Sequence, residues 1–296
     1  MNSYSRRDFL RTSIVAGTLA SVGTFPLEAA ERSAFDKVTL GKSGIKVTRL
    51  AFGTGSRNGQ VQAELGQQEF SKLIHYAYDR GIRFFETAEA YATPAMLGEA
   101  LKPFPRDSYV LMNKVTTDQG VDPLQRFDEM RRVSNTEYFD IMLLHWQHTG
   151  DWVTETSRWQ DGMMEAQAKK TILSRGASVH GLPALRQMPG NKFLQVAMIR
   201  MNHNGTSMDG EIADHGGLGN VTEVVEHVKQ VKQVKKDGMG VVSMKLCGNG
   251  SFTRHEDRVA AMRFAMQNAG VDCVTVGFKN RQEVDEAIDN LNLALS

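Results

Sequence analysis

The chain is poor in cysteine and carries no excess of charge of either sign. Its 296 residues contain only two cysteines, Cys247 and Cys273. This excludes a disulfide framework, a four-thiolate zinc site and a cysteine-bound iron–sulfur cluster. The 35 lysines and arginines balance 34 aspartates and glutamates, so the sequence has no electrostatic footprint for nucleic acid. No uninterrupted run of about 18 apolar residues occurs, and we expect no membrane span in the mature protein.

The first thirty residues have the pattern of an export signal. Residues 5–11 read Ser-Arg-Arg-Asp-Phe-Leu-Arg, and an apolar stretch with small residues follows from Ile14 to Phe25. A charged start, a short apolar region and a small-residue end are typical of a secretory signal. The Arg6-Arg7 pair is typical of the twin-arginine type. We therefore expect residues 1–30 to be a signal peptide read by the twin-arginine export machinery, and the mature protein to be periplasmic in a bacterium. A basic amphipathic helix is the alternative.

Beyond this segment, short apolar runs alternate with longer amphipathic stretches eight times. The runs are rich in Val, Ile, Leu and Phe, which is typical of parallel strands buried on both faces. The stretches between them, such as Gln67 to Arg80, have apolar residues at helical spacing. A short hairpin from Lys37 to Val47 precedes the first run. The strands that we expect are 48–53, 82–87, 109–115, 139–145, 172–178, 193–199, 239–245 and 271–276.

Eight strand-then-helix units predict that residues 31–296 form one (β/α)8 TIM barrel with a short N-terminal β-hairpin. Such a barrel occupies about 250 residues, and the 41% hydrophobic content is sufficient for one large core. A doubly wound open sheet is the alternative, but no Gly-x-Gly-x-x-Gly motif follows the first strand. Because barrels of this type carry their active sites at the carboxyl ends of the strands, polar residues at those ends are the candidates for chemistry.

Ionisable side chains end three consecutive strands. Glu86 and Tyr91 follow the second strand, Lys114 ends the third, and His145 ends the fourth. This set suits the reduction of a carbonyl group. Tyrosine, with a pKa of about 10, donates a proton poorly at pH 7 unless an ammonium group lies beside it. A carboxylate keeps that ammonium charged, and a neutral histidine holds and polarises the substrate oxygen.

The segment from Gly81 to Tyr91 reads Gly-Ile-Arg-Phe-Phe-Glu-Thr-Ala-Glu-Ala-Tyr, and Leu-Gly-Glu-Ala-Leu follows it at 97–101. Together they resemble the second strand and the following helix of the aldo/keto reductase family. The resemblance runs from about Val38 to Asn292. It implies an oxidoreductase that transfers hydride between a nicotinamide cofactor and a small carbonyl or alcohol substrate. The implied cofactor is NADP, with NAD as the alternative. It places Glu86, Tyr91, Lys114 and His145 where the family has its Asp, Tyr, Lys and His tetrad.

The resemblance also implies a set of cofactor-binding residues. Ser178 and Gln195 stand where the family contacts the nicotinamide amide. Lys245 and Gly248 fall in the loop that the family uses for the pyrophosphate. Lys279 and Arg281 fall in the loop that grips the adenosine phosphate, and they favour the phosphorylated cofactor. From the residues alone, Ser178, Gln195 and Lys245 are equally compatible with structural hydrogen bonds or ion pairs.

Two departures from the family pattern leave a second interpretation open. Glu86 replaces an Asp and changes the reach of the pair with Lys114, although we expect the ion pair to survive. Met244 replaces an aromatic ring, which removes about 1 kcal/mol of stacking on the nicotinamide. An exported barrel that binds a ligand without turning it over is therefore the alternative. An enzyme that holds one cofactor permanently stands between the two.

Two segments above the expected barrel mouth have no assigned role. Residues 203–215 contain two histidines and three carboxylates, but their spacing matches no common metal motif. We expect a loop that covers the substrate rather than a metal site. After the fourth strand, aromatic side chains are placed either to stack on a sugar ring or to pack the loop onto the barrel. They are Trp146, His148, Trp152 and Trp159.

Overall fold

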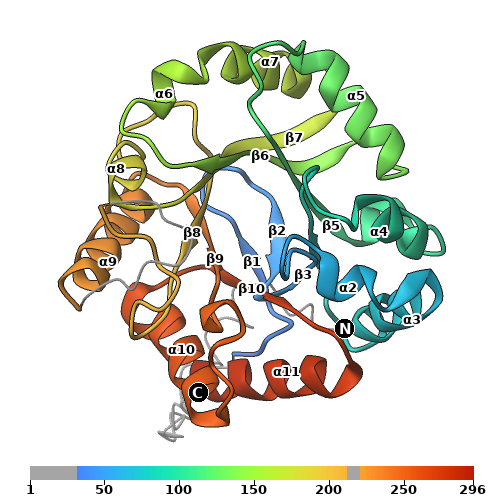
Figure 1. The fold of residues 1–296 in the computed structure, drawn as a ribbon, viewed down its shortest axis with the longest axis vertical. Helices are drawn as coiled ribbons and strands as arrows, with labels where there is room; N and C mark the ends of the chain where they lie inside the picture. Colours follow the sequence, from blue (N-terminus) through green and yellow to red (C-terminus); the bar gives the residue numbers. More distant parts are fainter. Residues whose placement is uncertain (1–31, 212–220) are drawn as a thin grey trace, which may run out of the picture. The chain divides into compact units, whose positions relative to one another are not determined.

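In the computed structural model, which describes residues 32–211 and 221–296, eight parallel strands close into a barrel ringed by helices (Figure 1). Around the barrel the strands follow the order β10-β3-β4-β5-β6-β7-β8-β9. The sheet is closed because β10 pairs with both β3 and β9, which confirms the predicted (β/α)8 barrel and excludes the open sheet. Arg32–Ser296 form one compact unit. The expected signal peptide lies outside the described residues.

Each barrel strand lies where the sequence predicts it, with ends shifted by a few residues. The strands are β3 (Leu50–Gly53), β4 (Phe84–Glu86), β5 (Val110–Val115), β6 (Phe139–Gln147), β7 (Ile172–Val179), β8 (Val196–Arg200), β9 (Gly240–Met244) and β10 (Cys273–Gly277). The helices are α2 (Gln60–Ala63), α3 (Gly66–Asp79), α4 (Pro94–Leu101), α5 (Pro123–Val133), α6 (Trp152–Glu155), α7 (Ser157–Ala168), α8 (Leu182–Leu185), α9 (Val221–Lys236), α10 (His255–Arg263) and α11 (Arg281–Leu295). Within the described part of the chain, no helix is both long and apolar enough to cross a membrane.

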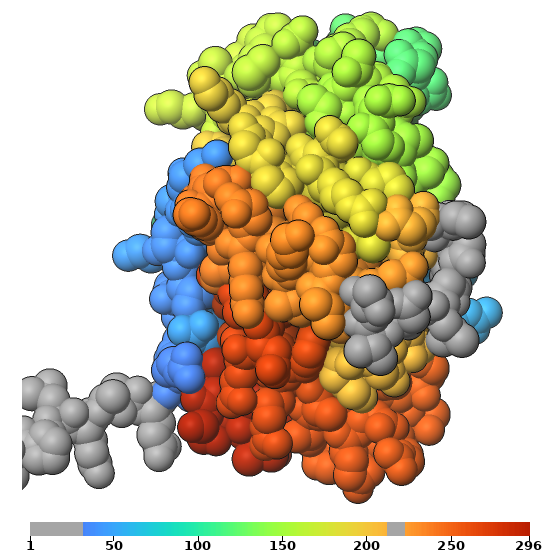
Figure 2. Space-filling model, turned by 90° about the vertical axis from the view of Figure 1, so that its left-hand side faces the viewer, coloured from blue at the N-terminus to red at the C-terminus, as the bar shows by residue number. Residues whose placement is uncertain are grey.

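The predicted hairpin covers the amino-terminal end of the barrel. Its strands, β1 (Lys37–Thr39) and β2 (Lys46–Thr48), pair antiparallel, and Figure 2 shows this segment in blue along one edge of the barrel. Leu40 belongs to the core inside the barrel. Gly41 pairs with Met239 and has a φ of 46°; a Cβ there would lie 2.2 Å from a backbone oxygen. Glycine therefore permits the close approach of the hairpin to the barrel.

Side chains of the barrel strands alternate between two apolar cores. On β8, Val196 and Met198 belong to the core inside the barrel, whereas Ala197 and Ile199 pack between the strands and the helices. Successive side chains of a strand point to opposite faces, so every second residue points inward. The interior core contains Leu40, Val47, Ala51, Phe84, Met112, Ile141, Leu143, Val196, Met198, Val242, Met244 and Cys273. An inward residue at the carboxyl end of a strand therefore points into the barrel mouth.

Candidate active site

The four predicted catalytic side chains come from adjacent strands and meet at the barrel mouth. Glu86 ends β4, Lys114 lies near the end of β5, and His145 lies near the end of β6. Each follows the inward-facing residues of its strand at a spacing of two, after Phe84, Met112 and Leu143 respectively. Tyr91 comes from the loop between β4 and α4. The barrel thus brings together groups that are far apart in the sequence.

The Glu86 carboxylate and the Lys114 ammonium form an ion pair inside the barrel. Lys114 Nζ donates hydrogen bonds to Glu86 Oε1 and, at 2.8 Å, to the carbonyl of Thr87. Lys114 is 0% exposed and Glu86 3%. Burial, and then the charge of Lys245, lowers the pKa of Lys114, while the contacting carboxylate favours the charged ammonium. The longer glutamate side chain therefore still reaches the lysine, as the sequence predicts.

The Tyr91 ring lies against three of its neighbours. Lys114 Nζ is 4.7 Å from the centroid of the Tyr91 ring, and the His145 ring meets it edge-on with centroids 5.6 Å apart. Gly55 borders the same ring so closely that a Cβ there would lie 2.7 Å from the hydroxyl oxygen. Burial raises the pKa of Tyr91 above its usual value, and the charge of Arg200 partly opposes this. The phenol is therefore protonated at pH 7, as a proton donor must be.

His145 is a neutral imidazole at pH 7. Burial lowers its pKa well below the usual value, and the charges of Lys114, His180 and Lys245 lower it further. His180 is buried nearby, and burial lowers its pKa to about 4, with the Asp209 carboxylate opposing. A neutral imidazole next to Tyr91 is able to donate a hydrogen bond to a substrate oxygen without adding charge to the mouth.

A cavity of about 560 Å³ opens beside Tyr91 and Glu86. Met198 and Met244 line it, together with Lys245, Leu246, Cys247, Asn249 and Gly250 from the end of β9 onward. Side chains from α10 and α11 line the rest, among them Arg258, Glu283, Glu286, Ala287 and Asn290. Sites for small molecules and cofactors occupy about 300–1,000 Å³, so the cavity has the volume of a cofactor site.

The loop after β9 offers a positive charge and a tight backbone turn to this cavity. The backbone of both Lys245 and Asn249 is in the left-handed region, each with a φ of 55°. Lys245 Nζ donates a hydrogen bond to Asn249 Oδ1 at 3.0 Å. Burial, and then Arg200, lowers the pKa of Lys245 to about 8, so the ammonium is charged at pH 7. Gly248 has a φ of 56°, and a Cβ there would lie 2.4 Å from Ser251 Oγ. An ammonium and a glycine turn are the groups that phosphate binding uses, so this donor set fits a dinucleotide.

At the far end of the cavity, the structure brings only one of the two predicted phosphate-binding residues to the wall. Lys279 lines the cavity, and its Nζ lies 3.5 Å from Glu283 Oε1. The Arg281 guanidinium instead lies over the Tyr76 ring, 5.0 Å from its centroid, and is not part of the wall. Arg258, which the sequence did not suggest, lines the cavity and pairs with Glu286 at 2.6 Å.

Gln195 lies at the opposite end of the barrel from the mouth, which corrects the prediction that it meets the nicotinamide. It precedes β8, and its Oε1 accepts hydrogen bonds from Gln167 Nε2 at 3.0 Å and from Ser174 Oγ and the Arg175 backbone N–H at 3.2 Å each. The prediction fails because Gln195 stands directly before β8, so the whole strand from Val196 to Arg200 separates it from the mouth. Gln195 therefore has the structural role that the residues alone left open.

Ser178 does lie near the mouth, and the neighbouring strand carries Arg200 there in place of Gln195. Ser178 is buried close to the end of β7, and its Oγ donates to Met244 Sδ at 3.8 Å. Arg200 ends β8, two residues after the inward-facing Met198, and is in register with Met244 on β9. The sequence contained the signal, since Val196, Met198 and Arg200 continue one alternating face, but the shifted strand end concealed it.

Arg200 is fixed by a buried carboxylate from the loop that follows β8. Arg200 Nη1 lies 2.7 Å from Asp209 Oδ1 and donates to the Ser207 carbonyl at 3.0 Å. Asp209 is 0% exposed and Arg200 4%. On its other side, Asp209 Oδ2 lies 3.4 Å from His180 Nδ1. The loop over the mouth is thus held by a chain of charged and polar side chains.

The expected loop 203–215 is described as far as residue 211, and its remainder lies outside the described residues. Within the described ranges, no three His, Cys, Asp or Glu side chains are grouped as metal ligands. Of the aromatics after β6, Trp152 and Trp159 are buried in the outer core. Trp146, at a φ of 55°, stays 37% exposed and stacks on His148 with ring centroids 4.3 Å apart. Of these four side chains, Trp146 and His148 are therefore the two that remain at least partly exposed.

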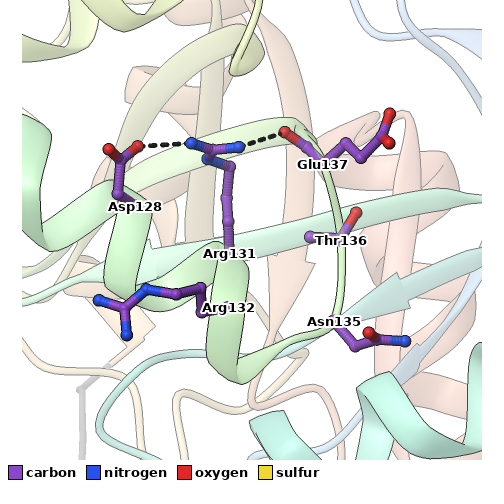
Figure 3. Close-up of a pocket in the computed structure, with 6 residues that line it drawn as sticks. All are labelled: Asp128, Arg131, Arg132, Asn135, Thr136 and Glu137. Carbon is purple, nitrogen blue, oxygen red and sulfur yellow. Dashed lines mark hydrogen bonds and ion pairs between the residues drawn. The ribbon is translucent and has the colours of Figure 1, made fainter.

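A second hollow, of about 670 Å³, lies where α5 ends and leads into β6 (Figure 3). Its walls are charged and polar, and Arg131 bonds there to Asp128 Oδ1 at 2.5 Å and to the Glu137 carbonyl at 2.8 Å. None of the tetrad lines this hollow. It lies at the amino-terminal end of the strands, so the mouth cavity is the candidate active site.

Known proteins resemble the chain in sequence. A sequence model of the aldo/keto reductase family matches residues 49–262. A protein from Glycine max named "Probable aldo-keto reductase 1" is 36% identical over 104 residues, which cover 34% of this chain and 29% of that protein. The versiconal hemiacetal acetate reductase of Aspergillus parasiticus is 36% identical over 95 residues, covering 28% and 27%. The chain thus spans less than a third of the length of these curated relatives.

Solved structures share the fold over most of the chain. An aldo-keto reductase from Bacillus halodurans in its holo form superposes with a TM-score of 0.68 at 15% identity, covering 88% of this chain and 95% of that one. An aldo-keto reductase from Klebsiella pneumoniae in complex with NADPH gives a TM-score of 0.65 at 16% identity, covering 88% and 91%. At these identities the likeness shows the fold alone. The sequence match at 49–262, however, covers most of the chain and contains the whole tetrad, and on that ground the chain belongs to the aldo/keto reductase family.

Proposed function

We propose that this chain is an NADP(H)-dependent oxidoreductase that interconverts a carbonyl and an alcohol in an aldehyde, ketone or sugar substrate. The observation that carries the proposal is the buried Glu86–Lys114 pair beside Tyr91 and His145, at the wall of a cofactor-sized cavity. The dinucleotide, when bound, supplies a hydride to the carbonyl carbon or removes one from the alcohol.

The side chains of the mouth handle the oxygen and the proton. Neutral His145 donates a hydrogen bond that holds and polarises the substrate oxygen. Tyr91 donates its phenolic proton to that oxygen as the carbon gains hydride, and its phenolate later regains a proton from solvent. Lys114 stabilises the phenolate by its charge, and Glu86 keeps Lys114 charged and in place. In the oxidation of an alcohol, the same groups act in reverse.

Several residues along the cavity are suited to hold the cofactor. Lys245 lines the cavity with Asn249 and Gly250, where pyrophosphate would take charge from the ammonium and contacts from the backbone. Gly248, predicted for the same role, lies in this turn but not in the cavity wall. Lys279 and Arg258 line the far end and favour the phosphorylated cofactor over NAD. We assign Ser178 to the nicotinamide amide because its Oγ contacts Met244 of the cavity wall, whereas Gln195 is too remote to contribute.

Cofactor binding tests the proposal directly. The purified mature protein is titrated with NADPH and NADH while nicotinamide fluorescence is followed, and denatured protein is first checked for released cofactor. We expect binding, or release of a cofactor already bound, with NADPH preferred. Tyr91→Phe should retain this binding and lose turnover of small aldehydes by at least about 100-fold. Absence of binding and release, or full turnover by Tyr91→Phe, would contradict the proposal.

Export through the twin-arginine machinery to the periplasm is part of the same proposal. It is supported by the Arg6-Arg7 pair ahead of a short apolar stretch, with residues 1–30 removed and 31–296 forming the mature domain. Cells that express the full chain are fractionated beside cells that express a variant with Lys-Lys at positions 6 and 7. We expect the full chain in the periplasm and the variant in the cytoplasm. The same distribution for both would argue against twin-arginine export.

A further inference from the structure

Arg200 is a buried cation close enough to Tyr91 to act on its pKa, although it does not itself line the cavity. It ends β8 on the inward face, one alternation step beyond Met198, and is in register with Met244 on β9. Met198 and Met244 both line the cavity next to Tyr91. Arg200 is 4% exposed and held by Asp209 at 2.7 Å, so its charge has a fixed position.

The nicotinamide ring has to lie at this end of the cavity. Hydride transfer requires the ring to approach the carbon whose oxygen is held by Tyr91 and His145. The candidate phosphate-binding residues Lys245 and Lys279 line the same cavity, from the loops that follow β9 and β10. A nicotinamide ring beside Tyr91 therefore lies near the wall residues Met198 and Met244, and these are the neighbours of Arg200 on β8 and on β9.

The two redox forms of the ring differ in charge, because oxidised nicotinamide carries a positive charge and reduced nicotinamide is neutral. A fixed guanidinium near the ring raises the free energy of the oxidised form and leaves the reduced form nearly unaffected. We propose that Arg200, positioned by Asp209, makes the site select the reduced dinucleotide and so favours carbonyl reduction over alcohol oxidation. This inference rests on the proposed function.

Although Arg200 is paired with Asp209, its positive charge still has the larger electrostatic effect on the other ionisable groups at the mouth. Arg200 lowers the pKa of Lys245 more than Asp209 raises it, and Arg200 also opposes the raised pKa of Tyr91. Among the described side chains here, the cations Lys114, Lys245 and Arg200 outnumber the carboxylates Glu86 and Asp209. The local field therefore disfavours a further positive charge.

The test compares dissociation constants for NADPH and NADP⁺, measured by calorimetry on the purified mature protein. We expect NADPH to bind on the order of tenfold more tightly in the wild type, which corresponds to about 1.4 kcal/mol. Arg200→Gln combined with Asp209→Asn removes both buried charges, so no unpaired ion is left to unfold the protein. In this double variant the two constants should approach each other. Arg200→Lys, which keeps the charge, should retain most of the preference.

A matched control uses the exposed Asp128–Arg131 pair on α5, which lies at the second hollow away from the mouth. Asp128→Asn with Arg131→Gln should leave the ratio of the two constants unchanged. An equal ratio in wild type and the Arg200–Asp209 double variant would overturn the inference while the proposed function stands. Failure of the wild type to bind either form would overturn both.

Discussion

Glu86→Gln leaves the Lys114 ammonium inside the barrel without the carboxylate that contacts it. Lys114 is 0% exposed, and its ammonium keeps a hydrogen bond to the Thr87 carbonyl at 2.8 Å. Removing one partner of a buried ion pair costs about 3–5 kcal/mol, because an uncompensated charge stays in a medium of low polarity. We expect the free energy of unfolding at pH 7 to fall by an amount in that range. Turnover should fall as well, because a Lys114 that loses its proton no longer stabilises the Tyr91 phenolate.

The pH dependence of stability identifies the cause. Burial already lowers the pKa of Lys114 below its unfolded value of about 10.4, and loss of Glu86 lowers it further. Between the folded and unfolded pKa values the unfolded chain binds more protons, so the free energy of unfolding rises with pH in this window. The window should begin at a lower pH in Glu86→Gln than in the wild type, and the variant should regain stability as pH rises toward about 10.

Urea unfolding across that pH range, followed by far-ultraviolet circular dichroism, is the assay. Glu86→Asp retains the charge and serves as a control that should lose less stability. Glu86→Gln with Lys114→Met removes both charges and should recover most of the loss, because no unpaired ion remains. A Glu86→Gln variant as stable as the wild type at pH 7, with no steeper rise at alkaline pH, would refute the reasoning.

Three further predictions follow from the site. Gly55→Ala should reduce kcat about 100-fold with little change in cofactor Kd, because its Cβ displaces the Tyr91 ring; steady-state kinetics check this. Gln195→Ala should cost about 1–3 kcal/mol in urea unfolding but leave the NADPH Kd unchanged, since its amide satisfies groups remote from the mouth; a weakened Kd would restore its cofactor role. NADPH affinity should fall as pH rises above about 8, where Lys245 loses its proton, and Lys245→Met should abolish this dependence in the same titration.

The barrel and the tetrad were predictable because both depend on local patterns. Strands buried on two faces read as continuous apolar runs, and the closed order of strands follows from their repetition. Such runs end at Glu86, Lys114 and His145. Their position at the mouth could therefore be predicted once the carboxyl ends of the strands were known. The Glu86–Lys114 ion pair could also be predicted, because adjacent parallel strands bring their carboxyl ends side by side.

Errors arose where the outcome depended on an exact strand boundary or on a long-range contact. Gln195 stands before the start of β8, at the end of the barrel opposite the mouth, and Arg200 was missed because the expected strand ends one residue too early. The sequence does not reveal which loop carboxylate closes back on that arginine; Asp209 does so nine positions later. The prediction that Arg281 binds the adenosine phosphate failed for a related reason. Its guanidinium contacts the ring of Tyr76 on α3, which is more than 200 positions away in the sequence.

The pairing of β10 with β3 has a consequence for how the protein is made. It joins Leu50–Gly53 to Val274–Gly277, so the barrel cannot close until residues 274–277 have left the ribosome. Contacts that distant in sequence form slowly, and the unpaired edges of β3 and β9 are open to wrong partners in the meantime. Closure of the barrel thus waits for the synthesis of β10, and a transport route that accepts only folded domains would have to wait for it as well.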